Sequence, residues 1–265
     1  MKTFIWKFAN FWQVVFFFVW SVVWQTISIT IRFVTFSQEL GLMLARNVWA
    51  PTLNGLTGSK IEVRGLEKVD LDKPHIYVFS HQSTLDISVA FQSIPRPLRF
   101  IAKKELLYIP FLGWYMWAMG MIFVDRKRGK KAIKSLQRAG ELIRNGANII
   151  AFPEGSRSPD GYIKPFKKGV FVVAIEAGVP IVPVAIEGTV DVMPKDTFIL
   201  RPRLIRVNVG EPIPTADCKY EDREELMHKV RNTVIDLHLE IGGRGGEKMY
   251  AETKATPEQE AAAAS

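Results

Sequence analysis

The chain has 265 residues, which is enough for one large domain with an appendage, and 48% of them are hydrophobic, a high share for a purely soluble protein. The net charge of +8 indicates an anionic partner such as a phospholipid surface, a nucleic acid or a phosphorylated substrate. The single cysteine, Cys218, excludes an intrachain disulfide and a cysteine-rich metal site, and the four histidines lack metal-ligand spacing.

The N-terminal segment, residues 1–58, is predicted to form a membrane anchor. Residues 8–31 carry no charge and are rich in Phe, Trp and Val, over a length sufficient to cross a bilayer. Residues 31–50 have the mixed polarity of a second, amphipathic helix, which we expect to end near Pro51. We therefore predict a two-helix membrane motif lying in or across one leaflet; a full span and a buried core helix are the alternatives.

A histidine and an aspartate follow the strongly apolar run 75–79, which predicts a buried strand. His81 lies just beyond this strand, and Asp86 lies in the first turn of the helix predicted to follow. From there Asp86 can hold one ring nitrogen of His81 protonated and leave the other free as a base. Two structural alternatives are open: Asp86 only caps the helix through the Ser83-x-x-Asp86 pattern, or His81 is an ordinary hydrogen-bonded strand-end residue.

A further apolar stretch, residues 106–124, follows a short predicted strand at 98–102. Pro110, Gly113 and Gly120 divide the stretch into short pieces, so we do not expect it to span a membrane. We predict instead that it packs partly in the core and partly against lipid, and that its last four residues form a strand.

The basic run 125–131 precedes a predicted amphipathic helix that ends near Asn145. Cations at a helix N-terminus oppose the helix dipole, so this run indicates a bound anion there, with Arg126 as the candidate phosphate ligand. The alternative is a solvated basic face that touches anionic lipid headgroups.

A tight turn, Pro153-Glu154-Gly155-Ser156-Arg157, follows the strand predicted at residues 148–152. The turn presents Glu154 and Arg157 at the same kind of strand end as His81, and an Arg side chain suits bidentate contact with a phosphate. An ion pair between Glu154 and Arg157 that only ties the loop is the alternative.

The remaining chain completes an α/β domain over residues 59–241. We predict a helix at 171–177, strands at 181–186 and 204–209, and a charge-rich helix at 221–241. Pro183 inside the first of these strands indicates a position that lacks one ladder hydrogen bond. From Gly242 to the last residue, 265, the Gly-rich and Ala-rich composition predicts a disordered tail.

Taken together, four stretches in order resemble the glycerophospholipid acyltransferase family over about residues 60–210. The first is the His-x4-Asp block of His81 and Asp86, and the third is the run from Phe152 to Ser158. The second resembles the family's block built on Lys103-Lys104-Glu105-Leu106, Pro110, Gly113, Gly120 and Asp125-Arg126, and the fourth is Val179-Pro180-Ile181-Val182-Pro183-Val184. Ser156 stands where the family commonly has Thr, a change that keeps the hydroxyl.

The resemblance implies an α/β fold with a mixed, largely parallel sheet flanked by helices. It also implies an enzyme that transfers a fatty acyl group from acyl-CoA or acyl-carrier protein to the sn-2 hydroxyl of lysophosphatidic acid, giving phosphatidic acid in phospholipid synthesis. His81 and Asp86 are then the catalytic dyad, without a covalent intermediate. The implied substrate-binding residues are Lys103, Lys104, Arg126, Glu154, Gly155, Ser156 and Arg157.

Neither a metal nor a cofactor is expected, because the acyl donor is itself a substrate. The expected partners are the two substrates and a phospholipid membrane, with no nucleic acid, and the catalytic domain is expected on the cytoplasmic face of the inner membrane. In this setting residues 106–124 help to line an acyl-chain slot.

Three rival functions remain open. A sister acyltransferase would act on glycerol 3-phosphate or another lysophospholipid. A basic protein that binds a membrane surface or nucleic acid would lack catalysis, although no aromatic-basic interleaving of an RNA-binding sheet is present. A serine or thiol esterase would form a covalent adduct, but the sequence has no Gly-x-Ser-x-Gly elbow.

Overall fold

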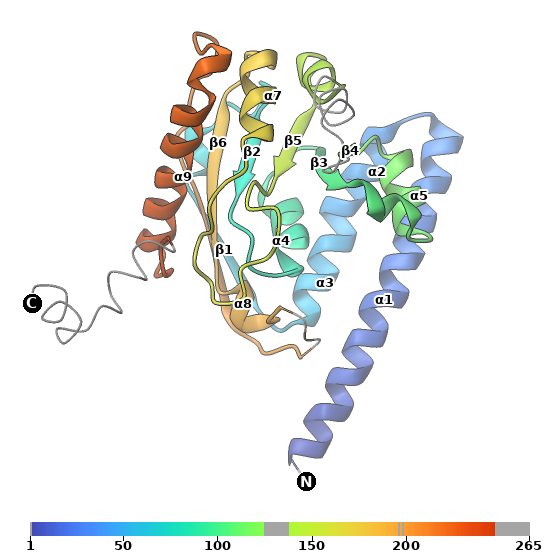
Figure 1. Ribbon diagram of the computed structural model, residues 1–265. Helices are drawn as coiled ribbons and strands as arrows, with labels where there is room; N and C mark the ends of the chain where they lie inside the picture. The colour runs from blue at the N-terminus through green and yellow to red at the C-terminus, as the bar shows by residue number, and fades with distance from the viewer. Residues whose placement is uncertain (1, 125–137, 196, 198, 247–265) are drawn as a thin grey trace, which may run out of the picture.

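A seven-stranded sheet stands between two layers of helices in the computed structural model of the chain, which describes all residues except 1, 125–137, 196, 198 and 247–265 (Figure 1). The strand order is β1-β7-β6-β2-β5-β3-β4. All neighbouring pairs are parallel except β6 with β7, so the predicted mixed, largely parallel α/β sheet is confirmed.

Strands β2 to β7 lie where the sequence predicts them, and they are preceded by β1, in which apolar and polar residues alternate. The strands are β1 (Lys60–Arg64), β2 (Ile76–Phe79), β3 (Leu98–Lys103), β4 (Ile122–Val124), β5 (Asn148–Ala151), β6 (Ile181–Glu187) and β7 (Leu204–Val209). The central strands β2 and β5 are buried at every position, as expected for parallel strands covered on both faces. Their C-terminal ends therefore meet at one edge of the sheet, where the loops that carry chemistry begin.

Pro183 lies inside β6, which is a central strand rather than an edge strand. Its carbonyl accepts a hydrogen bond from the Gly210 amide at 2.9 Å, just beyond the end of β7. The missing N–H of Pro183 points to that same side, where the regular β7 pairing has stopped, so the proline removes no bond from the ladder to β2.

The two faces of the sheet are covered by different helices. One face packs against α3 (Ala50–Leu56), α4 (Leu85–Ser93) and α5 (Leu112–Ala118), and the other against α7 (Gly169–Ala177) and α9 (Arg223–Glu240). A one-turn helix α8 (Thr189–Val192) follows β6, and the described residues 138–144 are helical as predicted. Each large apolar side chain buried in these two layers stabilises the fold by about 1.5–3 kcal/mol.

The N-terminal helices differ from their predicted boundaries. The first helix, α1 (Lys2–Thr35), continues four residues past Ile31, and a second, α2 (Gln38–Leu44), begins after Ser37, whose side chain accepts from the Leu40 amide at 3.4 Å. A π-helical turn (Ala45–Trp49) joins α2 to α3, so the second helical segment runs on to Leu56 and does not end near Pro51. Pro51 instead occupies the first turn of α3, where its missing N–H is tolerated.

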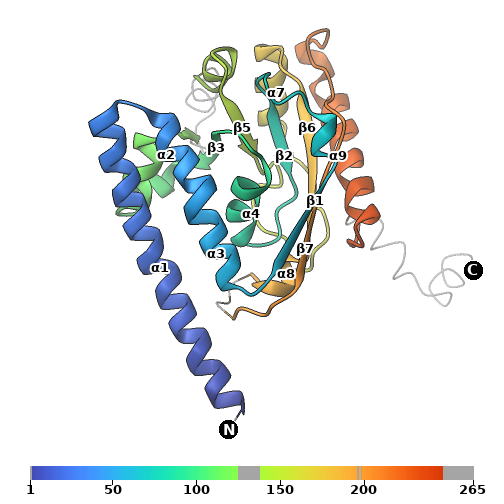
Figure 2. The ribbon, with the colours of Figure 1, turned by 180° about the vertical axis from the view of Figure 1, so that it is seen from behind.

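Helix α1 leans away from the sheet, and its N-terminal half extends beyond the body of the domain (Figures 1 and 2). Within the described part of the chain, Phe8–Thr35 is the helix long and apolar enough to cross a membrane. Large apolar side chains are exposed along it, including Phe8, Phe11, Trp12 and Val19. This exposure excludes the alternative of a buried core helix for its N-terminal half.

The chain after α9 does not begin as a free tail. The Gly243 amide donates to the His238 carbonyl at 2.8 Å, and the Ile163 amide donates to the Gly245 carbonyl at 2.8 Å. Disorder was therefore wrongly predicted for residues 242–246, because these backbone bonds hold them against the domain; residues 247–265 lie outside the described part.

Candidate active site

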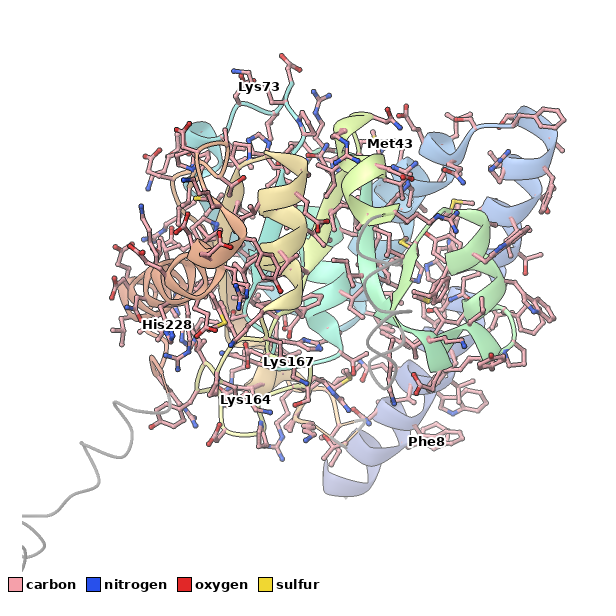
Figure 3. All side chains as sticks on the ribbon, turned by 45° about the horizontal axis from the view of Figure 1, so that its top comes forward. Phe8, Met43, Lys73, Lys164, Lys167 and His228 are labelled. Atoms are coloured by element: carbon pink, nitrogen blue, oxygen red, sulfur yellow. The ribbon has the colours of Figure 1, made fainter. Side chains whose placement is uncertain are left out.

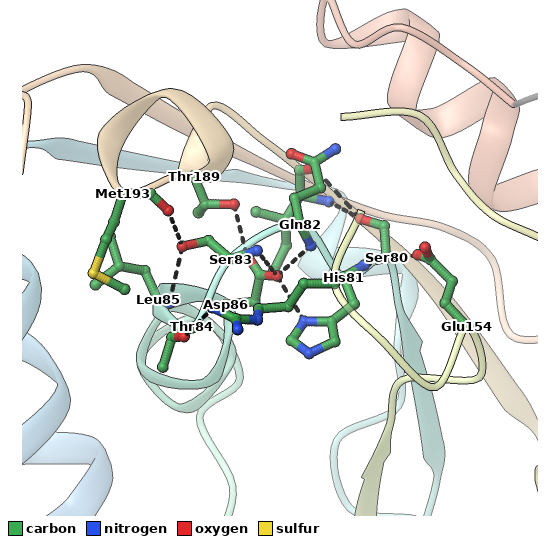
Figure 4. Close-up of polar contacts among 12 residues, drawn as sticks. Ser80, His81, Gln82, Ser83, Thr84, Leu85, Asp86, Glu154, Thr189 and Met193 are labelled. Carbon is green, nitrogen blue, oxygen red and sulfur yellow. Dashed lines mark hydrogen bonds and ion pairs between the residues drawn. The ribbon is translucent and has the colours of Figure 1, made fainter. Parts of the chain in front are cut away.

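The loop between β2 and α4 places His81 at the C-terminal edge of the sheet, with Asp86 in the first turn of α4 (Figure 4). His81 Nδ1 lies 2.8 Å from Asp86 Oδ2. The predicted pairing of these two side chains is thus present in the structure. An Nδ1–H directed at the carboxylate leaves Nε2 as the basic nitrogen of the ring.

Asp86 is fully buried and accepts four hydrogen bonds. Its Oδ2 accepts from the amides of Gln82 at 2.6 Å and Ser83 at 2.8 Å as well as from His81, and its Oδ1 accepts from Thr189 Oγ1 at 2.5 Å. The carboxylate therefore holds the loop that leads into α4 as well as the histidine, while the N-cap residue of α4, Thr84, makes no side-chain cap hydrogen bond.

Phe152 contacts the His81 ring, and two hydrogen bonds fix the His81 backbone. The His81 ring lies against the Phe152 ring with centroids 4.3 Å apart, and the His81 side chain is 16% exposed. The His81 carbonyl accepts from the Ser158 amide at 2.8 Å, and its amide donates to Glu154 Oε1 at 2.8 Å. The ring is thus held by Asp86 and Phe152 and retains contact with solvent.

The Glu154 side chain is turned into the protein and is 4% exposed. Its second oxygen, Oε2, accepts from the Lys164 amide at 3.2 Å. Burial raises the pKa of Glu154 to about 8, against the two backbone N–H groups, which favour the charged form. These contacts make Glu154 a positioning group between the His81 loop and residue 164; its predicted contact with substrate stays a prediction.

The rest of the predicted phosphate site is only partly assembled among the described residues. Arg157 Nη1 donates to Thr84 Oγ1 at 3.0 Å, which brings the guanidinium to the His81 loop. Gly155 has a φ of 74°, the left-handed conformation that favours glycine, and Ser156 Oγ accepts from Lys164 Nζ at 2.6 Å.

The cations predicted from the second block have separate places. Lys103 ends β3, which neighbours β5, and its Nζ lies 3.8 Å from Glu105 Oε1. Lys104 begins the 3-10 turn that follows. Arg126 lies outside the described residues, so its predicted phosphate contact stays a prediction.

Two hollows adjoin the His81 loop, and both reach Thr84. The first, of about 330 Å³, is almost entirely apolar and is lined by α1, α4 and the segment 106–116, including Phe17, Ile87 and Met116. The second, of about 340 Å³, contains Arg157 and also shares Phe17. Both volumes fall in the range of about 300–1,000 Å³ that is usual for small-molecule sites.

Three contributors to the site were missed in the sequence. Thr189 lies 103 residues from Asp86, so no local pattern connects them. The sequence also gave no reason to connect Lys164 with the turn that it contacts. Phe152 was visible as the residue before Pro153, but its stacking on His81 depends on β5 lying beside β2.

The comparisons with known proteins agree with this arrangement. A family model described as Acyltransferase matches residues 60–187. The 1-acyl-sn-glycerol-3-phosphate acyltransferase alpha of Ovis aries is 35% identical over 194 residues, 72% of this chain and 68% of that protein. The 1-acyl-sn-glycerol-3-phosphate acyltransferase of Saccharomyces cerevisiae is 32% identical over 208 residues, 77% of this chain and 68% of that protein.

Among solved structures, that of the 1-acyl-sn-glycerophosphate acyltransferase PlsC from Thermotoga maritima is similar, with a TM-score of 0.78 and 28% identity. The similarity covers 93% of this chain and 100% of that one. The sheet, the His81–Asp86 pair and these similarities agree with one another, and the chain belongs to the acyltransferase family that includes the 1-acyl-sn-glycerol-3-phosphate acyltransferases.

Proposed function

We propose that this chain is a 1-acylglycerol-3-phosphate O-acyltransferase, which moves a fatty acyl group from acyl-CoA or acyl-carrier protein to the sn-2 hydroxyl of lysophosphatidic acid. The product is phosphatidic acid. The observation that carries the proposal is the 2.8 Å contact between His81 Nδ1 and Asp86 Oδ2 beside an apolar hollow. The names of the relatives in sheep and yeast point to the same reaction.

In the proposed reaction His81 is the general base. Nε2 takes the proton of the acceptor hydroxyl as its oxygen attacks the thioester carbonyl carbon, and Asp86 stabilises the imidazolium that forms. When the tetrahedral intermediate collapses, the C–S bond breaks and the imidazolium returns the proton to the thiolate. No cofactor or metal takes part, and the carrier leaves as a thiol.

The hydroxyl groups near His81 support direct transfer rather than an acyl-enzyme. Ser80 Oγ donates to the Ile186 carbonyl at 3.3 Å, and Ser83 Oγ donates to the Met193 carbonyl at 2.7 Å. Both serines are fully buried, and because each hydroxyl donates to a backbone carbonyl, neither donates to the ring nitrogen that would activate it. The amides of His81, Gln82 and Ser83 all donate to side-chain carboxyl groups, so the oxyanion donor is proposed to lie outside these three groups.

The lipid parts of the substrates are proposed to lie in the hollow between α1 and α5. Helix α5, which packs against α1, carries the exposed side chains of Trp114 and Trp117, and α1 carries exposed aromatic side chains of its own. Helix α1 would anchor this side of the domain in the cytoplasmic face of the inner membrane, so that a lipid acceptor reaches His81 without leaving the bilayer surface.

An assay of the purified protein in mixed micelles tests the proposal. Lysophosphatidic acid, glycerol 3-phosphate and a neutral lysophospholipid would each be supplied with acyl-CoA and with acyl-carrier protein, and the labelled lipid products separated by thin-layer chromatography. We expect phosphatidic acid from lysophosphatidic acid as the main product. A faster reaction with glycerol 3-phosphate or another lysophospholipid would assign the chain to a sister enzyme, and no acyl transfer to any acceptor would contradict the proposal.

A further inference from the structure

The strap, residues 162–168, lies across the turn that contains Glu154, Gly155, Ser156 and Arg157. The Lys164 amide donates to Glu154 Oε2 at 3.2 Å, and the Lys167 amide donates to the Pro153 carbonyl at 2.9 Å. From the other side Arg231 Nε donates to the Lys164 carbonyl at 3.1 Å. The strap is therefore fixed by its backbone, and the side chains of Lys164 and Lys167 have defined positions over the turn.

Because Gly155 has no side chain, the Lys167 ammonium can lie close to the backbone of the turn. A Cβ at residue 155 would lie 2.8 Å from Lys167 Nζ and 3.0 Å from its Cε, too close for real atoms. The backbone of the turn thus approaches this ammonium directly. Lys164 Nζ lies on the same turn, donating to Ser156 Oγ at 2.6 Å, and a lysine ammonium has three donors, so two remain.

These two ammonium groups have no carboxylate ion pair among the residues that the structure describes. The nearest acid in sequence, Asp160, accepts from Ser158 Oγ and from the Tyr162 amide. Glu154 is turned inward to the amides of His81 and Lys164. Neighbouring Lys168, by contrast, is paired with Glu224 at 2.5 Å. Cations gathered without a counter-ion repel one another, and a bound anion relieves that repulsion.

We propose that Lys164 and Lys167 form a phosphate-binding site on the exposed side of the turn, next to the guanidinium of Arg157. This inference rests on the proposed function, because it assigns the bound group to a substrate of the same reaction. A phosphate there could belong to the glycerol phosphate of the acceptor or to the phosphopantetheine arm that both candidate donors share. Figure 3 shows Lys164 and Lys167 near each other, at the end of the molecule opposite Lys73.

Steady-state kinetics of Lys164→Gln, Lys167→Gln and Lys167→Arg test the proposal. We expect each glutamine variant to raise the KM of one phosphate-bearing substrate by about tenfold or more, with kcat changed less, because a charge-assisted hydrogen bond is lost. Lys167→Arg should recover most of the affinity. A raised acceptor KM assigns the site to the headgroup, and a raised donor KM assigns it to the carrier.

Two matched variants control for a general loss of positive charge. Lys168→Gln changes the next residue in the chain, which is exposed but paired with Glu224, and Lys73→Gln changes an exposed lysine that is paired with Asp70 at 2.8 Å. Both should keep the wild-type KM values. Unchanged KM values for both substrates in both glutamine variants at 164 and 167, or equal changes in the controls, would overturn the proposal.

Lysine acetylation followed by mass spectrometry gives a readout that does not depend on turnover. Glycerol 3-phosphate and CoA, added separately as probes, should slow acetylation of Lys167 relative to Lys168 if a phosphate binds there. Protection without any acyl transfer would keep the anion site and reject the proposed reaction. Transfer activity without protection by either probe would reject the anion site alone.

Discussion

Replacing Asp86 with Asn tests whether the carboxylate acts on His81 during catalysis or only holds the loop before α4. An asparagine can keep its oxygen on the three donors now at Oδ2, which are His81 Nδ1 and the amides of Gln82 and Ser83. Its amide nitrogen would then face Thr189 Oγ1, whose hydroxyl can turn to accept. The variant should therefore fold, while the negative charge beside the imidazole is lost.

The size of the effect follows from the distance between the two groups. Unit charges 2.8 Å apart attract by about 6 kcal/mol at an effective dielectric constant of about 20. The imidazolium is only partly formed in the transition state, so about half of this, ~3 kcal/mol, is lost, which corresponds to a fall in kcat of about a hundredfold. A change in the ring tautomer would extend the fall to about 10⁴-fold, the loss known for serine-protease triads.

The assay is the initial rate of acyl transfer in mixed micelles for wild-type protein, Asp86→Asn and Thr189→Val, with the thermal midpoint of each measured alongside. Thr189→Val removes one hydrogen bond to Asp86 but keeps the charge, so we expect it to lower kcat by about tenfold at most. An Asp86→Asn variant that keeps kcat within about threefold of wild type would refute an electrostatic role for the carboxylate.

Three further predictions concern the surroundings of the dyad. Burial raises the pKa of Glu154 from 4.5 to about 8 in the fold. The protonated carboxyl therefore contributes its full share of stability below pH 4.5, and this contribution is lost as the pH rises from 4.5 through about 8. The thermal midpoint of wild type should fall over that range more than that of Glu154→Gln, and parallel curves would contradict this. Ile87 lines the apolar hollow, so Ile87→Phe should shift acyl-donor preference toward shorter chains and Ile87→Ala toward longer ones, measured as relative kcat/KM across a chain-length series; an unchanged preference would remove the hollow from the acyl site. Helix α1 should keep the protein in the membrane pellet after alkaline carbonate extraction, and release into the supernatant would exclude an integral anchor.

The contact between His81 and Asp86 was predictable because both residues and the elements that carry them are local in sequence. A buried strand, a short turn and a helix start fix the distance between His81 and Asp86, and the apolar run at residues 75–79 is enough to locate that strand. The partners that hold the pair were not predictable. Thr189 and Phe152 reach it only through the order of β6, β2 and β5 in the sheet, which no short motif encodes.

Helix boundaries and the chain after α9 show the same division between local and long-range causes. Arg32 does not end the apolar helix α1. The helix stops instead before Phe36, which has a φ of 56° and precedes the N-cap residue of α2. The glycine-rich residues after α9 have a composition typical of disorder, yet the Ile163 amide and the His238 carbonyl hold them in place. The composition indicates how much conformational entropy is lost when such a segment becomes ordered. It does not show which hydrogen-bond partners offset that loss.

The most direct test of the account is the turnover of His81→Ala, because every step of the proposed chemistry passes through the ring nitrogen Nε2. The variant would be purified beside wild type and assayed with lysophosphatidic acid and an acyl thioester, with its thermal midpoint and its binding to phospholipid vesicles measured on the same sample. We expect kcat to fall by about 10²–10⁴-fold or more, while folding and vesicle binding stay as in wild type. A folded, vesicle-bound His81→Ala protein with kcat within about threefold of wild type would contradict the account.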